Sequence, residues 1–133
     1  REFRPDLIYF ENTGFGTRGP SATRSGSDAV AQAYSGLLAG DGKVDEFGAP
    51  EIITATAPAD FHAGLAGAMA ISAALFHRER SGTGQYIETS LLQAGLALQG
   101  MRVSRLPAID AQTTDKTMAK MRAAGPRPPA SAT

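Results

Sequence analysis

The sequence contains no cysteine, which excludes disulfide bonds, thiolate nucleophiles and cysteine-based metal sites. It has no excess charge of either sign, because 13 basic residues balance 13 acidic ones. Such a balance gives no reason to expect binding to nucleic acid or to an anionic membrane surface. No uninterrupted apolar run reaches the roughly 20 residues that a membrane span requires, and no signal peptide opens the chain. We therefore expect a cytoplasmic protein.

What is present is the composition of a single globular unit. A chain of 133 residues suffices for about one domain. Hydrophobic residues make up 42% and charged residues 20% of the chain, which is typical of folded domains. The chain opens at Arg1, a few residues before a predicted strand, and a strand of a parallel sheet needs neighbours on both sides. Few candidate strands follow it, so we expect an internal segment of a longer protein.

Hydrophobic periodicity predicts strands and helices in alternation, and this order indicates an α/β fold with three helices interleaved with short strands. The expected elements are strands at residues 6–13, 51–57 and 84–92, and helices at residues 28–39, 60–80 and 91–104. The helix at 60–80 is apolar on nearly every side, which predicts that it is buried. Residues 107–133 are polar and proline-rich, and we expect them to be disordered.

The stretch "GFGTRG" at residues 14–19 has the spelling G-x-G-x-x-G of a dinucleotide-binding turn. In such a turn a helix begins at the motif, because its free N–H groups hold the pyrophosphate. Here Pro20 and a polar segment follow, and the predicted helix starts about eight residues after the motif. The context therefore favours a glycine-rich turn between a strand and a loop.

Three longer stretches, at residues 4–20, 24–39 and 57–98, together resemble one family. They read "RPDLIYFENTGFGTRGP", "RSGSDAVAQAYSGLLA" and "APADFHAGLAGAMAI…", the last running through R-x-G-x-G-Q into a strand and a helix. In this order and spacing they resemble the class III CoA-transferases of the formyl-CoA and carnitine-CoA transferase type. The resemblance implies that residues 1–106 are part of the large α/β domain of such an enzyme, with 107–133 a poorly matched tail.

The resemblance implies that Asp60 is the nucleophile. In this chemistry a carboxylate attacks the thioester of a donor acyl-CoA, and an aspartyl-CoA thioester then passes CoA to an acceptor acid. The start of a helix suits the role, because the helix N-terminus favours negative charge and its N–H groups could stabilise an oxyanion. From the residues alone, an aspartate in this position predicts a helix cap, and the two roles are compatible.

Two alternatives stay open at this point. Racemases of the same fold that act on acyl-CoA carry a catalytic histidine where this chain has Ser27, and a serine cannot exchange an α-proton as imidazole can. The racemase or epimerase reaction is therefore disfavoured, while Ser27 remains a candidate for the acyl pocket. The second alternative is an inactive, truncated fragment, since the chain alone is expected to lack part of its active site.

The remaining candidates are substrate-binding residues near Asp60. Arg24 is expected to meet the CoA phosphates or a substrate carboxylate, although a solvated loop charge is the commoner role. Gly14 and Gly16 are expected to let the backbone pass close to pantetheine or to a partner subunit. The two histidines, His62 and His77, are expected to be structural, because they have no acids at ligand spacing and make a poor metal site.

These expectations define the ligands and partners. We expect no metal and no permanently bound cofactor, with coenzyme A and acyl-CoA acting as substrates together with a carboxylic acid. The resemblance also implies an interlocked homodimer whose active sites use both chains. We expect no nucleic-acid or membrane partner.

Overall fold

The computed structural model describes residues 4–100. In chain order its elements are β1 (Tyr9–Thr13), α1 (Asp28–Ser35), α2 (Leu37–Asp41), α3 (Pro58–Ser81), β2 (Tyr86–Ser90) and α4 (Leu91–Ala97). The predicted α/β class is confirmed, with four helices beside a short sheet. The prediction of a disordered tail at residues 107–133 falls outside the described residues.

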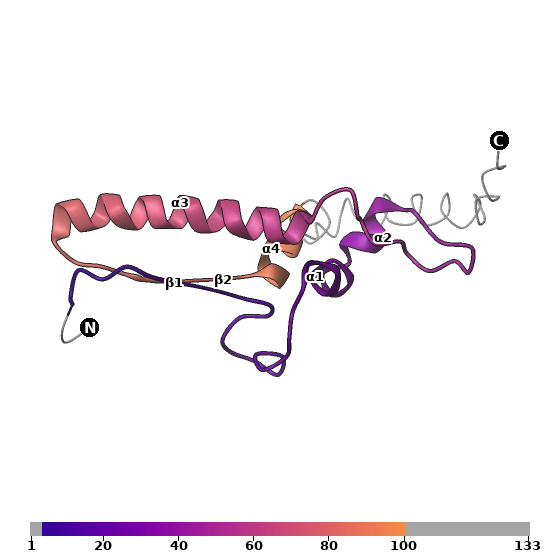
Figure 1. The fold of residues 1–133 in the computed structure, drawn as a ribbon, viewed down its shortest axis with the longest axis horizontal. Coiled ribbons are helices and arrows are strands. Elements are labelled where there is room, and N and C mark those ends of the chain that lie inside the picture. Colours follow the sequence, from indigo (N-terminus) through magenta and orange to yellow (C-terminus); the bar gives the residue numbers. More distant parts are fainter. Residues whose placement is uncertain (1–3, 101–133) are drawn as a thin grey trace, which may run out of the picture.

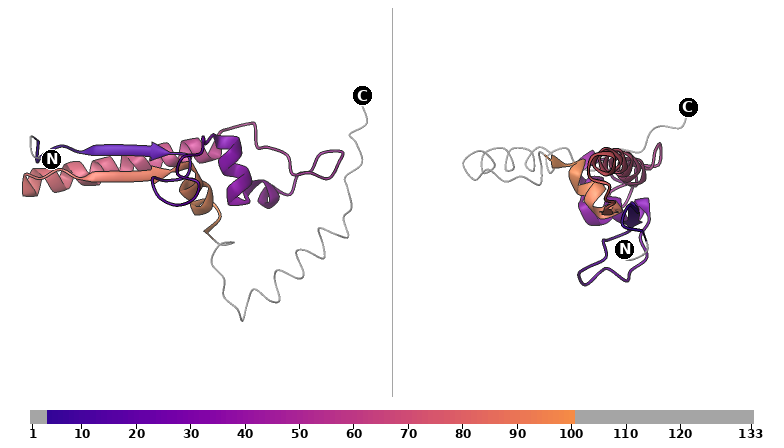
Figure 2. Two further views of the ribbon diagram at one scale, coloured as in Figure 1. Left: turned by 90° about the horizontal axis from the view of Figure 1, so that it is seen from below. Right: turned by 90° about the vertical axis from the view of Figure 1, so that its left-hand side faces the viewer.

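The two strands lie side by side and run parallel, with Tyr9 opposite Tyr86 and Thr13 opposite Ser90. Figure 1 shows α3 running along the strands in the opposite direction, so that it begins at their carboxyl ends. The shorter helices α1, α2 and α4 gather at that same end, which is also visible in the left view of Figure 2. The architecture therefore places the start of α3 where α/β proteins commonly bind their ligands, outside the carboxyl ends of parallel strands.

Helix α3 packs against its neighbours through small residues. Its buried positions are Ala59, Ala63, Gly67 and Ala74. At Gly67 the ring of Phe10 from β1 fills the space of a side chain, and a Cβ built there would lie 2.6 Å from the ring's Cζ atom. The small size of the side chains on this face, and the lack of one at Gly67, let the helix approach the sheet closely.

The large apolar side chains of α3 point the other way. Phe61, Leu65, Met69 and Phe76 are each between 64% and 74% exposed among the described residues. The prediction of a buried helix is therefore wrong for this part of the chain, because two strands and two short helices cover only its small-residue face. By length and composition α3 could cross a membrane, a test that the core helix of a soluble protein passes equally.

Two further expectations are corrected. The helix predicted at residues 28–39 is interrupted at Gly36, whose φ of 79° ends α1 and starts α2 in a new direction. Residues 51–57 form no strand, because the backbone N–H and C=O of Ile53 bond to the side chain of Gln32 instead of to a sheet. The last helix begins at Leu91 as expected, and α4 ends at Ala97.

Candidate functional site

Asp60 is the third residue of α3, and this helix begins near the carboxyl ends of the two strands. Its side chain is exposed. Within the described residues its carboxylate takes part in no hydrogen bond or ion pair. The carboxylate is therefore free to react, while hydrogen bonds from a distant part of the chain fix the backbone beneath it.

The start of α3 has no cap of its own. Ala57 precedes the helix and contributes no side-chain hydrogen bond, and Pro58 has no backbone N–H. The carboxylate of Asp28 supplies the missing acceptor from α1: its Oδ1 accepts the N–H of Ala59 at 2.8 Å and that of Asp60 at 3.3 Å. A side chain remote in sequence therefore caps the helix that carries Asp60.

Asp28 is itself held by Gln32, one turn further along α1. The Gln32 Nε2 donates to Asp28 Oδ2 and, at 3.1 Å, to the carbonyl oxygen of Ile53. Its Oε1 accepts the N–H of Ile53 at 3.0 Å, and the whole residue is fully buried. These bonds join α1, the segment before α3 and the start of α3 into one network, which we call the Asp28 network.

This arrangement corrects one part of the sequence interpretation. The N–H groups at the start of α3 were expected to stabilise an oxyanion, but those of Ala59 and Asp60 already donate to Asp28. The next one, from Phe61, donates to the carbonyl oxygen of Ala57 at 2.9 Å. Any donors to an oxyanion at Asp60 must therefore come from other groups.

Gly14 and Gly26 lie in close contact at the two ends of the loop between β1 and α1. A Cβ on Gly14 would lie 2.6 Å from the Cα of Gly26, so neither position has room for a side chain. The carbonyl oxygen of Gly14 also accepts the N–H of Leu92 at 3.1 Å, at the start of α4. Gly14 thus has a role within the chain, and its predicted contact with pantetheine or a partner subunit stays a prediction.

The other end of the GFGTRG turn is fastened to β2. The N–H of Gly16 donates to Thr13 Oγ1 at 2.8 Å, and Glu88 accepts from both the N–H and the hydroxyl of Thr17 at 2.7 and 2.8 Å. The backbone hydrogen bond from Thr17, followed by that from its hydroxyl, holds the pKa of Glu88 below its usual value. The segment thus leads from β1 into a loop, as the sequence interpretation predicts, and side chains of Thr13 and Glu88 hold it in place.

Ser27 and Arg24 also have partners within the chain. Ser27 precedes α1, and its Oγ accepts the N–H of Val30 at 3.4 Å. The next residue, Asp28, accepts the backbone N–H of Asp60. Arg24 donates to the hydroxyl of Tyr34 at 2.8 Å and remains exposed. The structure therefore places Ser27 next to the residue that bonds to the Asp60 backbone, and directs Arg24 toward α1. Substrate contacts by either residue stay predictions.

The open face of the sheet is aromatic and acidic. The rings of Tyr9 and Tyr86 stack with centroids 5.7 Å apart, and Glu11 lies opposite Glu88 in the strand register. Tyr86 donates its hydroxyl to Glu11 at 2.7 Å, and this bond, together with partial burial, raises the pKa of Tyr86 to about 12. Like charges that face each other on neighbouring strands repel. Here Glu11 accepts a hydrogen bond from Tyr86 and Glu88 accepts one from Thr17, and these bonds offset the repulsion.

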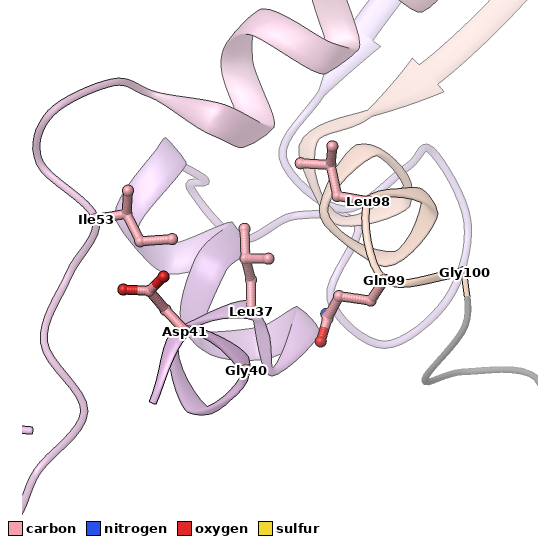
Figure 3. A pocket seen from close by; sticks show the side chains of 7 residues that line it. All are labelled: Leu37, Gly40, Asp41, Ile53, Leu98, Gln99 and Gly100. Carbon is pink, nitrogen blue, oxygen red and sulfur yellow. The ribbon is translucent and has the colours of Figure 1, made fainter. Parts of the chain in front are cut away.

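A pocket of about 380 Å³ lies at the ends of α2 and α4 (Figure 3), and Asp60 is not among the residues that line it. It is lined by Leu37, Gly40, Asp41, Ile53, Leu98, Gln99 and Gly100. Its one charged side chain, Asp41, is negative and lies 3.6 Å from Lys43. Among residues 4–100 the lining contains no cation for the phosphates of CoA, so this part of the chain alone does not form the expected substrate site there.

The histidines take different positions. His77 lies near the end of α3, where its Nε2 is 3.3 Å from Thr83 Oγ1, and His62 is half-buried near the start of the helix. Among residues 4–100 no group of three or more histidine, aspartate or glutamate side chains is placed to hold a metal ion.

Neither Asp28 nor Gln32 was singled out from the sequence. Two signals were available. The residues before Asp60, Ala57 and Pro58, contain no capping side chain, so the free N–H groups of α3 needed a partner from elsewhere. Asp28 and Gln32 are also four residues apart, the spacing at which polar side chains pair on one helix face.

The comparisons with known proteins agree with this picture. Residues 1–127 match CoA-transferase family III. The chain is 42% identical over 104 residues to the succinate–glutarate CoA-transferase of Agrobacterium fabrum, an overlap of 76% of this chain and 25% of that protein. It is 35% identical over 96 residues to the acetyl-CoA:oxalate CoA-transferase of Acetobacter aceti, and the match covers 72% of this chain and 24% of that protein.

The fold is similar to that of a hypothetical protein from Mycobacterium tuberculosis whose crystal structure is known. The TM-score is 0.70 at 33% identity, and the match covers 77% of this chain and 29% of that one. This chain thus spans about a quarter of the length of the relatives that it matches. The match to the family covers most of the sequence, and the chain belongs to CoA-transferase family III.

Proposed function

We propose that the protein containing this chain transfers CoA from an acyl-CoA donor to a carboxylic acid acceptor, and that Asp60 carries the CoA as a covalent thioester. The observation that supports the proposal is the state of Asp60. Its carboxylate is exposed and unbonded within the described residues, while its backbone N–H is held by Asp28 at 3.3 Å. A nucleophile needs this combination of a free side chain on a fixed backbone.

The proposed reaction begins when an Asp60 oxygen attacks the carbonyl carbon of the donor thioester. The C–S bond breaks, which leaves a mixed anhydride on Asp60 and a CoA thiolate. The thiolate attacks the aspartyl carbonyl and releases the donor as a free carboxylate, so that Asp60 now holds CoA as a thioester. The acceptor carboxylate then repeats these two steps in reverse order, which yields the new acyl-CoA and restores the Asp60 carboxylate.

The relatives' names support dicarboxylic or short-chain acids as substrate classes, since they include succinate, glutarate, acetyl-CoA and oxalate. We propose that Ser27, Arg24, Gly14 and Gly16 line the approach to Asp60. We also propose a cytoplasmic homodimer in which the chain needs further residues for activity. The racemase alternative gains no support, because these relatives are CoA-transferases and position 27 holds a hydroxyl that caps α1.

Intact-mass spectrometry of the complete protein tests the proposal. After mixing with succinyl-CoA or acetyl-CoA, the wild-type protein should gain the mass of one CoA less water, and hydroxylamine should remove it. The Asp60→Ala variant should gain no such mass and should lose CoA-transfer activity by at least about 1,000-fold, as expected for a deleted nucleophile.

Asp45→Ala is the matched control, because Asp45 lies in the loop after α2 and its hydrogen bonds stay within that loop. This variant should form the adduct as the wild type does. The proposal fails if the wild type traps no CoA from any donor in a panel of acyl-CoAs. It also fails if the adduct persists in Asp60→Ala.

A further inference from the structure

The Asp28 network holds the residue that we propose as the nucleophile without touching its carboxylate. We infer that Asp28 is a positioning residue for Asp60 and that Gln32 keeps Asp28 in the required orientation. This inference rests on the proposed function, because it concerns the placement of Asp60 for attack on a thioester.

The contact from Asp28 reaches the backbone of Asp60 itself. One carboxylate oxygen accepts the N–H of Ala59 at 2.8 Å and that of Asp60 at 3.3 Å, across 31 and 32 residues of sequence. Hydrogen bonds to a charged acceptor are stronger than those between neutral groups. Because α3 has no local cap, this carboxylate determines how the first turn of the helix sits against α1.

Gln32 fixes the direction of Asp28 because its amide can bond in one orientation only. Its Oε1 accepts the N–H of Ile53 and its Nε2 donates to the carbonyl oxygen of Ile53, so a reversal of the amide would lose both bonds. The Nε2 therefore presents a donor to Asp28 Oδ2. Gln32 is also fully buried, so water cannot take the place of any of these partners.

This arrangement requires an acceptor on both side-chain oxygens of residue 28. In an Asp28→Asn variant the amide oxygen could still face α3, but its NH2 group would then oppose the NH2 group of Gln32. The opposite orientation would direct the NH2 group at the N–H groups of Ala59 and Asp60. Either way the network loses a contact, and the first turn of α3 is free to shift although the overall shape of the side chain is unchanged.

A shift of the nucleophile should act on the chemical step. A displacement of about 1 Å can lower a rate by about 100-fold, and substrate binding through other groups need not change. In the complete protein we expect Asp28→Asn to lower kcat by about 100-fold and to leave KM for the acyl-CoA within about threefold of wild type. Formation of the CoA adduct at Asp60, followed by rapid-quench mass spectrometry, should slow by the same factor.

A second variant guards against poor folding of the first. Gln32→Met retains the Asp28 carboxylate and the volume of the buried side chain, and should lower kcat by about tenfold. Because both residues belong to one network, the double variant should be no slower than Asp28→Asn alone. Rates are compared per folded molecule, well below the melting temperature of each variant.

Asp45→Asn provides the matched control. Asp45 Oδ1 also accepts two backbone N–H groups, from Phe47 and Ala49 at 2.9 and 2.8 Å, but in a surface loop. This variant should keep the wild-type kcat even if it melts at a lower temperature.

The inference is overturned if both Asp28→Asn and Gln32→Met, once corrected for unfolded protein, form the adduct at the wild-type rate. It is also overturned if the two effects multiply in the double variant, or if Asp45→Asn slows the reaction as much. A wild-type protein that forms no adduct overturns the proposed function itself, and the positioning role with it.

Discussion

The two ends of α3 are built in opposite ways. At its C-terminal end, Gly82 adopts the left-handed conformation and donates its N–H to the carbonyl oxygen of Arg78 at 2.8 Å, and Ser81 bonds back to that of His77 at 2.9 Å. At its N-terminal end no neighbouring side chain serves as a cap, and Asp28 supplies the acceptor across more than 30 residues. The end proposed for catalysis is therefore the one that depends on the tertiary structure.

The two ends of α3 therefore depend on different interactions. The C-terminal end is fixed by local signals and by the strands, so it should form wherever the helix forms. The N-terminal end adopts its observed conformation only when α1 is packed against it, because Asp28 of α1 supplies its cap. We expect changes at the first end to alter stability alone, and changes at the second to alter the reaction as well.

The largest effect on stability is expected at Gly84, which leads from the C-terminal end of α3 into β2. Gly84 is buried, donates its N–H to the carbonyl oxygen of Pro5 at 2.8 Å, and has the backbone of Leu7 where a Cβ would stand. Gly84→Ala should lower the free energy of unfolding by about 3 kcal/mol, because the obstructing atoms belong to the backbone. Urea denaturation of the complete protein measures the loss, and a loss below about 0.5 kcal/mol would contradict it.

A smaller effect is expected at Gly82, where the backbone conformation alone is at issue. Its φ is 70°, and no atom lies within 4 Å of a Cβ built there. Gly82→Ala should lower the free energy of unfolding by about 1 kcal/mol, because alanine adopts the left-handed region at a cost. Gly64→Ala is the control inside the same helix, about two turns from its start. It should leave stability unchanged or raise it by up to about 1 kcal/mol, since alanine favours helix and the space is open.

These two glycines, Gly84 and Gly82, also sharpen the comparison of the helix ends. Both variants should keep the wild-type rate of adduct formation at Asp60 per folded molecule, because they act at the far end of α3. A large fall in that rate would show that the C-terminal end also positions the nucleophile.

The smallest predicted effect is the loss of stability at low pH that is due to Glu88. The hydrogen bonds from Thr17 lower the pKa of Glu88, so this carboxylate contributes stability above its ordinary pKa of 4.5 and loses it as the pH falls through the lowered value. Stability measured between pH 7 and pH 3 should fall less steeply in Glu88→Gln than in wild type. Glu51→Gln is the control, because Glu51 has no side-chain hydrogen bond within the described residues, and it should follow the wild-type curve.

The sequence predicted the parts of the fold that depend on local chemistry. Hydrophobic periodicity located both strands and the long helix, and the predicted end of that helix at residue 80 lies one residue from its observed end at Ser81. The resemblance to class III CoA-transferases directed attention to Asp60, and family membership is confirmed. None of these inferences required a contact between distant residues.

Two of the errors came from tertiary contacts. Residues 51–57 have the composition of a strand, yet Gln32 takes the backbone groups of Ile53 that a strand would have paired. Helix α3 is apolar all round, but it buries its smallest residues and exposes its largest ones, because Phe10 fits against Gly67. Periodicity reports which side chains are apolar and not which of them finds a partner.

The amide of Gln32 has one more consequence, for the surface loop at residues 42–50. The chain leaves α2 at Asp41, and its backbone is next held at Ile53 by two hydrogen bonds with the Gln32 side chain. We therefore expect that the loop between these points can change length without displacing α3. A peptide tag or a fluorescent label inserted near Phe47, which is 86% exposed, would therefore report on the protein in solution and leave its proposed chemistry intact.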